Sequence, residues 1–172
     1  KKTPPKWLTK GIPLTRVLFV CTGNICRSVM AQAVAAQKAE EETLDNLVFD
    51  SVGVSDEEHG NPPDYRAVHI LEDHGWLVPD HHARQISRSD FEDFDLLLAM
   101  TSGHKRALTR LAQRWGADES KIRLYREFDP EASEGDMEVP DPWYGGEREF
   151  ADTLEVIERV TPVILEVLSE IS

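Results

Sequence analysis

The sequence predicts a single α/β domain built on an open four-stranded parallel sheet with helices on both faces. Short apolar runs of strand length, at residues 17–21 and 96–100, alternate with longer segments in which apolar residues recur at helical spacing. Such alternation is typical of a parallel sheet whose crossover helices cover both faces. A turn of small and polar residues follows the first apolar run, and in open parallel sheets ligands bind at that end of the strands.

The individual elements follow from the same pattern. We expect strands at residues 16–21, 47–51, 95–100 and 122–124, and helices at residues 27–42, 64–74, 103–115 and 147–168. The last helix has an apolar stripe that would pack on the sheet. Pro162 should kink or split this helix near Glu158, because proline has no backbone N–H to donate.

Composition indicates one soluble domain. The chain has 172 residues, 40% of them hydrophobic and 30% charged, which suits a single core. Residues 1–14 are basic and contain proline, so we expect a flexible extension before a domain at residues 15–172. The net charge of −13 argues against nucleic acid and anionic membranes as partners, and the apolar runs are too short to cross a bilayer. We expect a cytoplasmic protein that is a monomer or a weak dimer.

The turn after the first strand has the pattern of a phosphate-binding loop that contains a nucleophile. It consists of Cys21, Thr22, Gly23, Asn24, Ile25, Cys26, Arg27 and Ser28. A loop that leads from a strand into a helix directs backbone N–H groups and the helix dipole at one point, which favours an oxyanion. The same field favours the thiolate form of Cys21, and the planar guanidinium of Arg27 can hold two phosphoryl oxygens. A buried structural cysteine is the alternative interpretation.

A second chemical group is needed to hydrolyse a phosphate ester through a phosphocysteine. The leaving oxygen needs a proton and the attacking water then needs a base, and one carboxyl group can do both in turn. Asp141 is the candidate, because it lies between Pro140 and Pro142 on a loop that continues with Trp143 and Tyr144. From the local sequence alone, an ordinary turn aspartate is an equal alternative.

The loop resembles the signature of the low-molecular-weight protein tyrosine phosphatases. Further segments match that family in order over about residues 15–170, at residues 50–53, 62–67, 74–75, 83–86, 94–100 and 141–145. The resemblance implies the fold of phosphotyrosine phosphatase I, with Cys21 as nucleophile, Arg27 as phosphate ligand and Asp141 as general acid and base. It implies phosphotyrosine proteins as substrates, phosphate or other oxyanions as ligands of the loop, and no metal or other cofactor.

The resemblance also assigns supporting residues. Ser28 would donate a hydrogen bond to the Cys21 sulfur, and Asn24, Ser51 and His74 would hold the loop in shape. From the local sequence alone, His74 is better explained as a surface or capping histidine just before Gly75.

The aromatic rings after the acid are expected to shape the substrate pocket. Trp143 and Tyr144 would form its wall, with the packing of their loop as the alternative role. Glu57 and Glu58 stand where relatives often have an aromatic residue, which predicts an acidic mouth that disfavours phosphopeptides with acidic flanks.

Other positions depart from the family pattern. Val29 replaces a proline and Gln32 a glutamate at the start of the first helix, and Thr101 and His104 replace an aspartate and an asparagine. Any contact of these last two with the site is open.

Cys26 is the second of the two cysteines. A reversible disulfide with Cys21 and a simple buried thiol are both open interpretations. A zinc site is not expected, because no Cys/His pair has ligand spacing.

Two other functions share this loop or its chemistry. A thiol-dependent arsenate reductase has the same fold but needs further cysteines outside the loop. A catalytically silent phosphotyrosine reader would need neither a nucleophile nor a proton donor. Relatives that act on phosphoarginine tend to have threonine where Ile25 stands, so Ile25 favours tyrosine.

Overall fold

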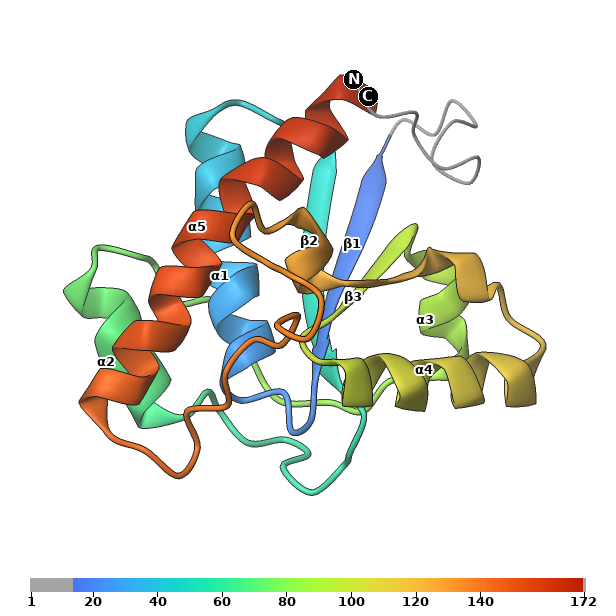
Figure 1. Cartoon of the computed structure of the whole chain (residues 1–172), viewed down its shortest axis with the longest axis horizontal. Helices are drawn as coiled ribbons and strands as arrows, with labels where there is room; N and C mark the ends of the chain where they lie inside the picture. The colour runs from blue at the N-terminus through green and yellow to red at the C-terminus, as the bar shows by residue number, and fades with distance from the viewer. Residues whose placement is uncertain (1–13, 172) are drawn as a thin grey trace.

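The computed structural model describes residues 14–171 and confirms the predicted α/β class. Four parallel strands form one sheet in the order β2-β1-β3-β4. The strands are β1 (Thr15–Cys21), β2 (Leu47–Gly53), β3 (Leu96–Ala99) and β4 (Ile122–Leu124). Figure 1 shows helices on both sides of the sheet. The expected extension at residues 1–14 lies almost entirely outside the described residues.

The helices were predicted in part. The four expected helices are α1 (Arg27–Glu41), α2 (Tyr65–Asp73), α4 (Ser102–Trp115) and α5 (Glu147–Ile171). The structure adds a short α3 (Arg88–Asp93) and two 3-10 turns, η2 (Glu119–Lys121) and η3 (Tyr125–Phe128). No helix among residues 14–171 has the length and apolar character that crossing a membrane requires.

The core has two parts because side chains of a strand alternate between the faces of the sheet. Val17 and Phe19 of β1 pack on the face covered by α1 and α5, and Leu18 and Val20 pack on the face covered by α3 and α4. All four are fully buried, so β1 is the centre of the molecule. The site therefore begins at the end of the most enclosed strand.

A buried carboxylate attaches α5 to the body. Asp129, just after η3, is bonded by the guanidinium groups of Arg159 on α5 and Arg126 on η3. These bonds, first of all those from Arg159, hold the pKa of Asp129 well below its usual range. Tyr125 is also fully buried, and its hydroxyl is 2.8 Å from Thr161 Oγ1. The two connections fix the helix that directly follows the Asp141 loop.

The expected split of α5 at Pro162 is wrong. The helix continues through Pro162 to Ile171. Apolar residues on both sides of the proline, Ile157, Val160, Ile164 and Leu165, are at most 1% exposed. Packing of this stripe therefore outweighs the one backbone hydrogen bond that proline removes.

Candidate active site

The turn between β1 and α1 forms a loop at the carboxyl edge of the sheet. Cys21 ends β1, and Cys26 is the N-cap of α1 without a side-chain bond to the first turn. No side-chain cap therefore occupies the backbone N–H groups in the first turn of α1, and these groups can bind an anion. Asn24 has a φ of 63°, in the left-handed region that asparagine tolerates better than most residues. Asn24 therefore allows the sharp turn between Cys21 and the start of α1.

The segment after β2 supports this loop from the side. Val54 N donates to Cys21 O at 2.9 Å, and Ser55 N donates to Thr22 O at 3.0 Å. A Cβ atom at Gly53 would lie 2.5 Å from Thr22 O, so a side chain there would push the loop out of place. Gly53 is thus a structural requirement of the loop.

A buried polar network leads from β2 to the sulfur. Asn24 Nδ2 donates to both Ser28 Oγ and Ser51 Oγ at 3.0 Å. Ser51 Oγ in turn donates to Gln32 Oε1, and Ser28 Oγ lies 3.0 Å from Cys21 Sγ. Because Ser28 accepts from Asn24, its own hydrogen is available to the sulfur. The structure thus joins Asn24, Ser28 and Ser51 as expected, and adds Gln32.

His74 does not lie in this network. It is the C-cap of α2, and its Nδ1 is 3.6 Å from a carboxylate oxygen of Glu158. The expectation for His74 is corrected in favour of the capping alternative. A histidine that does support the loop from this part of the chain is His81. Its Nε2 donates to Asn24 O at 2.8 Å, and Arg84 N donates to Asn24 Oδ1 at 3.0 Å.

Arg27 and Asp141 face each other across the site. Arg27 is 5% exposed, and its Nη1 donates to Val139 O at 3.1 Å. Its Nη2 is 3.5 Å from Asp141 Oδ2, and the Asp141 side chain is 51% exposed. The Asp141 carboxyl group is thus held near the guanidinium of Arg27 while it remains open to solvent.

A cavity of about 240 Å³ brings most of the expected residues together. Its lining comprises Cys21, Thr22, Gly23, Ile25, Cys26, Arg27, Glu57, Glu58, Asp141, Trp143 and Tyr144. Tyr144 is 95% exposed and Trp143 is 40% exposed, so both rings stand at the mouth. The cavity is thus basic and sulfur-containing at its base, with aromatic and acidic residues at its rim.

Arg66, which the sequence analysis did not select, connects the loop at residues 21–28 to the segment that follows Asp141. Its guanidinium makes a two-pronged pair with Asp64, and Asp64 N donates to Ile25 O on the phosphate loop. Its Nη1 donates to the carbonyl oxygens of Trp143 and Gly145 at 3.0 and 3.1 Å. The Asp64 carboxylate raises the pKa of Arg66 further, so this link stays charged.

His104 is a second residue that the sequence left open. Its Nε2 is 2.8 Å from Thr22 Oγ1, and its Nδ1 is buried with no partner among the described residues. Burial, and after it the charge of Arg27, lowers the pKa of His104 to about 4. The ring is therefore neutral near pH 7. Thr101, the other departure, is the N-cap of α4.

Cys26 differs from Cys21 in its surroundings. Burial, and then the nearby charge of Asp64, raises the pKa of Cys26 far above its ordinary value. Both cysteines are unpaired. Cys26 is therefore a protonated thiol on the loop that carries Cys21.

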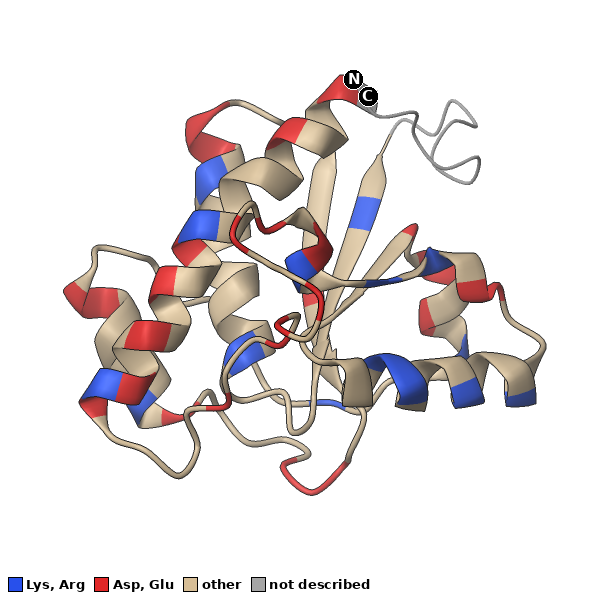
Figure 2. Cartoon of the chain, in the orientation of Figure 1, with Lys and Arg blue, Asp and Glu red and all other residues tan. Residues whose placement is uncertain are grey.

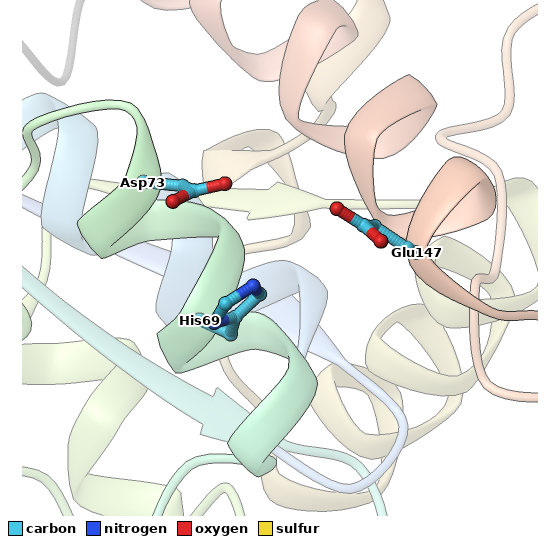
Figure 3. Close-up of side chains that lie close together, drawn as sticks. All are labelled: His69, Asp73 and Glu147. Carbon is cyan, nitrogen blue, oxygen red and sulfur yellow. The ribbon is translucent and has the colours of Figure 1, made fainter.

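A cluster of potential metal ligands lies between α2 and α5. His69, Asp73 and Glu147 point toward one another (Figure 3), with ligand atoms within 4.8 Å. All three are exposed, and none of them lines the cavity around Cys21. We give this cluster no part in the chemistry of the loop.

Comparisons with known proteins agree with this site. The family model described as low molecular weight phosphotyrosine protein phosphatase matches residues 16–171. The low molecular weight protein-tyrosine-phosphatase of Streptomyces coelicolor is 45% identical over 90% of this chain and 94% of its own. The Gallus gallus phosphatase is 38% identical over 87% and 93%. A protein tyrosine phosphatase structure from Entamoeba histolytica has a TM-score of 0.82 at 31% identity, covering 91% of this chain and 97% of its own. The chain belongs to the low molecular weight phosphotyrosine protein phosphatase family.

Proposed function

We propose that this enzyme hydrolyses phosphotyrosine in proteins, and other aryl phosphates, through a cysteinyl-phosphate intermediate. The observation that supports it most is one cavity that holds Cys21, Arg27 and Asp141. These groups supply a nucleophile, a ligand for the transferred phosphoryl group and a proton donor.

The first step forms the phosphocysteine. The Cys21 thiolate attacks phosphorus while Arg27 and the loop amides bind the phosphoryl oxygens, and Asp141 gives its proton to the departing aryl oxygen. The ion pair between Arg27 and Asp141 would give way when the phosphoryl group occupies the guanidinium. Asp141 can then reach the leaving oxygen.

The second step returns the enzyme to its first state. The Asp141 carboxylate takes a proton from a water molecule, whose oxygen attacks phosphorus and displaces the Cys21 thiolate. Inorganic phosphate leaves, and Ser28, 3.0 Å from the sulfur, stabilises the returning negative charge. The supporting roles of Asn24 and Ser51 are to keep Ser28 in this orientation.

The preference for phosphotyrosine follows from the residues at the rim of the cavity around Cys21. Trp143 and Tyr144 offer aromatic surfaces to the ring of phosphotyrosine, and Ile25 favours this substrate over phosphoarginine. An arsenate reductase would need more cysteines than the two of this chain, and both of these are on the loop. We place the enzyme in the cytoplasm, where its thiolate would stay reduced.

The proposal also includes control by oxidation. Peroxide would convert the Cys21 thiolate to a sulfenic acid, and Cys26 would then form a disulfide with release of water. Activity after peroxide treatment should recover with a reductant in the wild type and much less in Cys26→Ser. Equal recovery of the two proteins would contradict this role of Cys26.

Turnover of para-nitrophenyl phosphate tests the function directly. Cys21→Ser should be inactive, and Asp141→Ala should be slower by roughly 10²–10⁴ fold because no proton reaches the leaving group. The exposed Asp152→Ala is a matched control that should keep wild-type turnover. An Asp141→Ala enzyme at full speed would show that another carboxyl group is the acid.

A further inference from the structure

Helix α4 is basic in an otherwise acidic protein. Its 14 residues include Lys105, Arg106, Arg110 and Arg114 and no acidic residue, whereas the whole chain has a net charge of −13. Figure 2 shows these positions as a series of blue bands along α4, while the acidic residues gather on the other helices and loops. Helix α4 therefore carries a net positive charge, unlike the chain as a whole.

Three of these residues form a row on the exposed side of the helix. Arg106, Arg110 and Arg114 are each four residues apart, and all three are exposed. Leu108 and Ala112, which are fully buried, face the sheet from the opposite side. None of the three arginines has an ion pair within 4.0 Å among residues 14–171. Their charges are free to act on a ligand.

The surface is hollowed beside the start of this row. A depression of about 460 Å³ is lined by Ser102, Lys105, Arg106, Thr109, Arg110 and Leu124. Ser102 is held there by Glu138, which accepts from both its backbone N and its hydroxyl. The hydroxyls of Ser102 and Thr109 already donate to Glu138 and to Lys105 O, so the depression offers the guanidinium groups of Arg106 and Arg110 to a carboxylate.

The sheet order places this surface on one side of Cys21. Strand β1, which ends at Cys21, lies between β2 and β3, and all strands run in the same direction. The loop after β2 brings Glu57 and Glu58 to one border of the cavity. Helix α4 follows β3 on the other side, where its His104 contacts Thr22. The approach to the sulfur is therefore acidic on one side and basic on the other.

We propose that the row of Arg106, Arg110 and Arg114 binds acidic residues on one flank of the phosphotyrosine in a protein substrate. This inference rests on the proposed phosphatase function and names its preferred substrates. The row spans about 12 Å at the rise of an α-helix. An extended chain covers that length with about four residues. A short acidic block, separated from the phosphotyrosine by a neutral spacer, fits the row.

The acidic mouth expected from Glu57 and Glu58 then disfavours acidic residues on the opposite flank only, and that flank would be neutral or basic. Acidic residues placed there would meet Glu57 and Glu58, where like charges oppose binding. The charge of the two borders thus fixes the direction in which a substrate lies across the cavity. A long polyanion such as RNA fits less well, because it would extend beyond α4 over a protein whose net charge is −13.

Three phosphotyrosine peptides test the inference. The first peptide carries a block of about four glutamates on the N-terminal side of the phosphotyrosine, and the second carries the same block on its C-terminal side. The third peptide has neutral residues on both sides. One of the two acidic peptides should have a KM roughly tenfold below the other, as three surface ion pairs allow. This difference should shrink when KCl is raised from about 50 to about 200 mM.

The matched variants separate this surface from net charge. In the triple variant Arg106→Gln, Arg110→Gln, Arg114→Gln the KM difference should disappear, while kcat and KM for para-nitrophenyl phosphate stay at wild-type values. A control with Lys38→Gln, Arg88→Gln and Arg148→Gln loses the same charge elsewhere and should keep the difference. Equal KM values for both acidic peptides with the wild type would overturn the inference, as would arginine-dependent binding of a labelled single-stranded RNA without any peptide preference. Loss of para-nitrophenyl phosphate turnover by the wild type would instead refute the phosphatase proposal.

Discussion

At the scale of single residues, the loop depends on side chains that arrive from distant parts of the chain. Asn24 is completely buried, and every polar group of its side chain has a partner. Its left-handed backbone is thus balanced by bonds to Ser28, Ser51 and Arg84 N. A loop held in this way would need little rearrangement to bind a phosphate, as the proposed stabilisation of a transition state requires.

His104 should make stability depend on pH. Burial keeps the pKa of His104 at about 4, below the ordinary value near 6.5 of the unfolded chain. The unfolded state therefore binds more protons between these two values, so stability is lost as the pH falls from about 6.5 toward about 4. At pH 5 the loss should be about 2 kcal/mol relative to pH 7.5. Urea unfolding at the two pH values measures it.

The variant His104→Asn provides the comparison. Its amide can still contact Thr22 but binds no proton, so it should lack this part of the pH dependence. His69→Asn changes an exposed histidine of α2 that does not line the cavity around Cys21, and it should behave as the wild type. If His104→Asn and the wild type lose the same stability at pH 5, the buried ring is not the cause.

Sequence reasoning found the residues whose place is set by their neighbours in the chain. Residues 21–28 form one continuous turn, so the strand and helix on either side fix where they lie. His104 and His81 reach the same turn from 82 and 57 residues away, and only the packing of β3 and of the loop after α2 brings them there. The prediction that His74 supports the loop was wrong for the same reason. Its position near the end of a helix gives no information on which face of the fold it occupies.

At the scale of elements, the Asp141 loop is held by its neighbours. Val139 O accepts from Arg27, and Val139 N donates to Met100 O at the end of β3. After Asp141, Arg66 of α2 donates to the carbonyl oxygens of Trp143 and Gly145, and its guanidinium lies 5.2 Å from the centre of the Trp143 ring. The loop is therefore anchored on both sides of Asp141.

Arg66→Lys should loosen the second anchor. Lysine keeps the charge but cannot reproduce the planar contacts to Asp64 and two carbonyl groups. We expect kcat for para-nitrophenyl phosphate to fall roughly tenfold, equivalent to about 1.4 kcal/mol, with little change in KM. Hydrogen exchange of the Trp143 and Gly145 amides should become faster. The control Arg148→Lys, at an exposed position of α5, should change neither quantity; unchanged exchange in Arg66→Lys would remove its positioning role.

Elements were predicted where the apolar period was long and clear. Strand β1 and helix α4 lie within one residue of their expected bounds. Helix α3 has six residues and is too short for a periodic signal. It is held by a capping box between Ser87 and Asp90 and by the ion pair of Asp90 with Arg84. The partner that completes it lies outside the segment, which local pattern reasoning does not detect.

At the scale of the whole molecule, a net charge of −13 surrounds a site that must accept an anion. Arg27 and the loop amides create local attraction, while the acidic surface repels substrate at longer range. The basic helix α4, which carries no acidic residue (Figure 2), reduces this repulsion on one side of the approach. The remaining excess of acidic residues also destabilises the folded state through repulsion between like charges.

Salt should therefore stabilise the fold. Like charges on the compact state repel, and screening relieves this repulsion, whereas the buried pairs of Asp129 with Arg126 and Arg159 are screened much less. Raising KCl from about 20 to about 200 mM at pH 8 should relieve about 1 kcal/mol of this electrostatic repulsion, which corresponds to a rise in Tm of roughly 2–4 °C.

Chloride is the required anion in this experiment, because phosphate would bind the loop around Cys21 and stabilise the protein for another reason. At pH 5.5, nearer the pI of about 4.8, the net charge is smaller and the same salt step should raise Tm much less. A Tm that falls with salt at pH 8 would mean that favourable ion pairs, rather than self-repulsion, dominate the electrostatic free energy of folding.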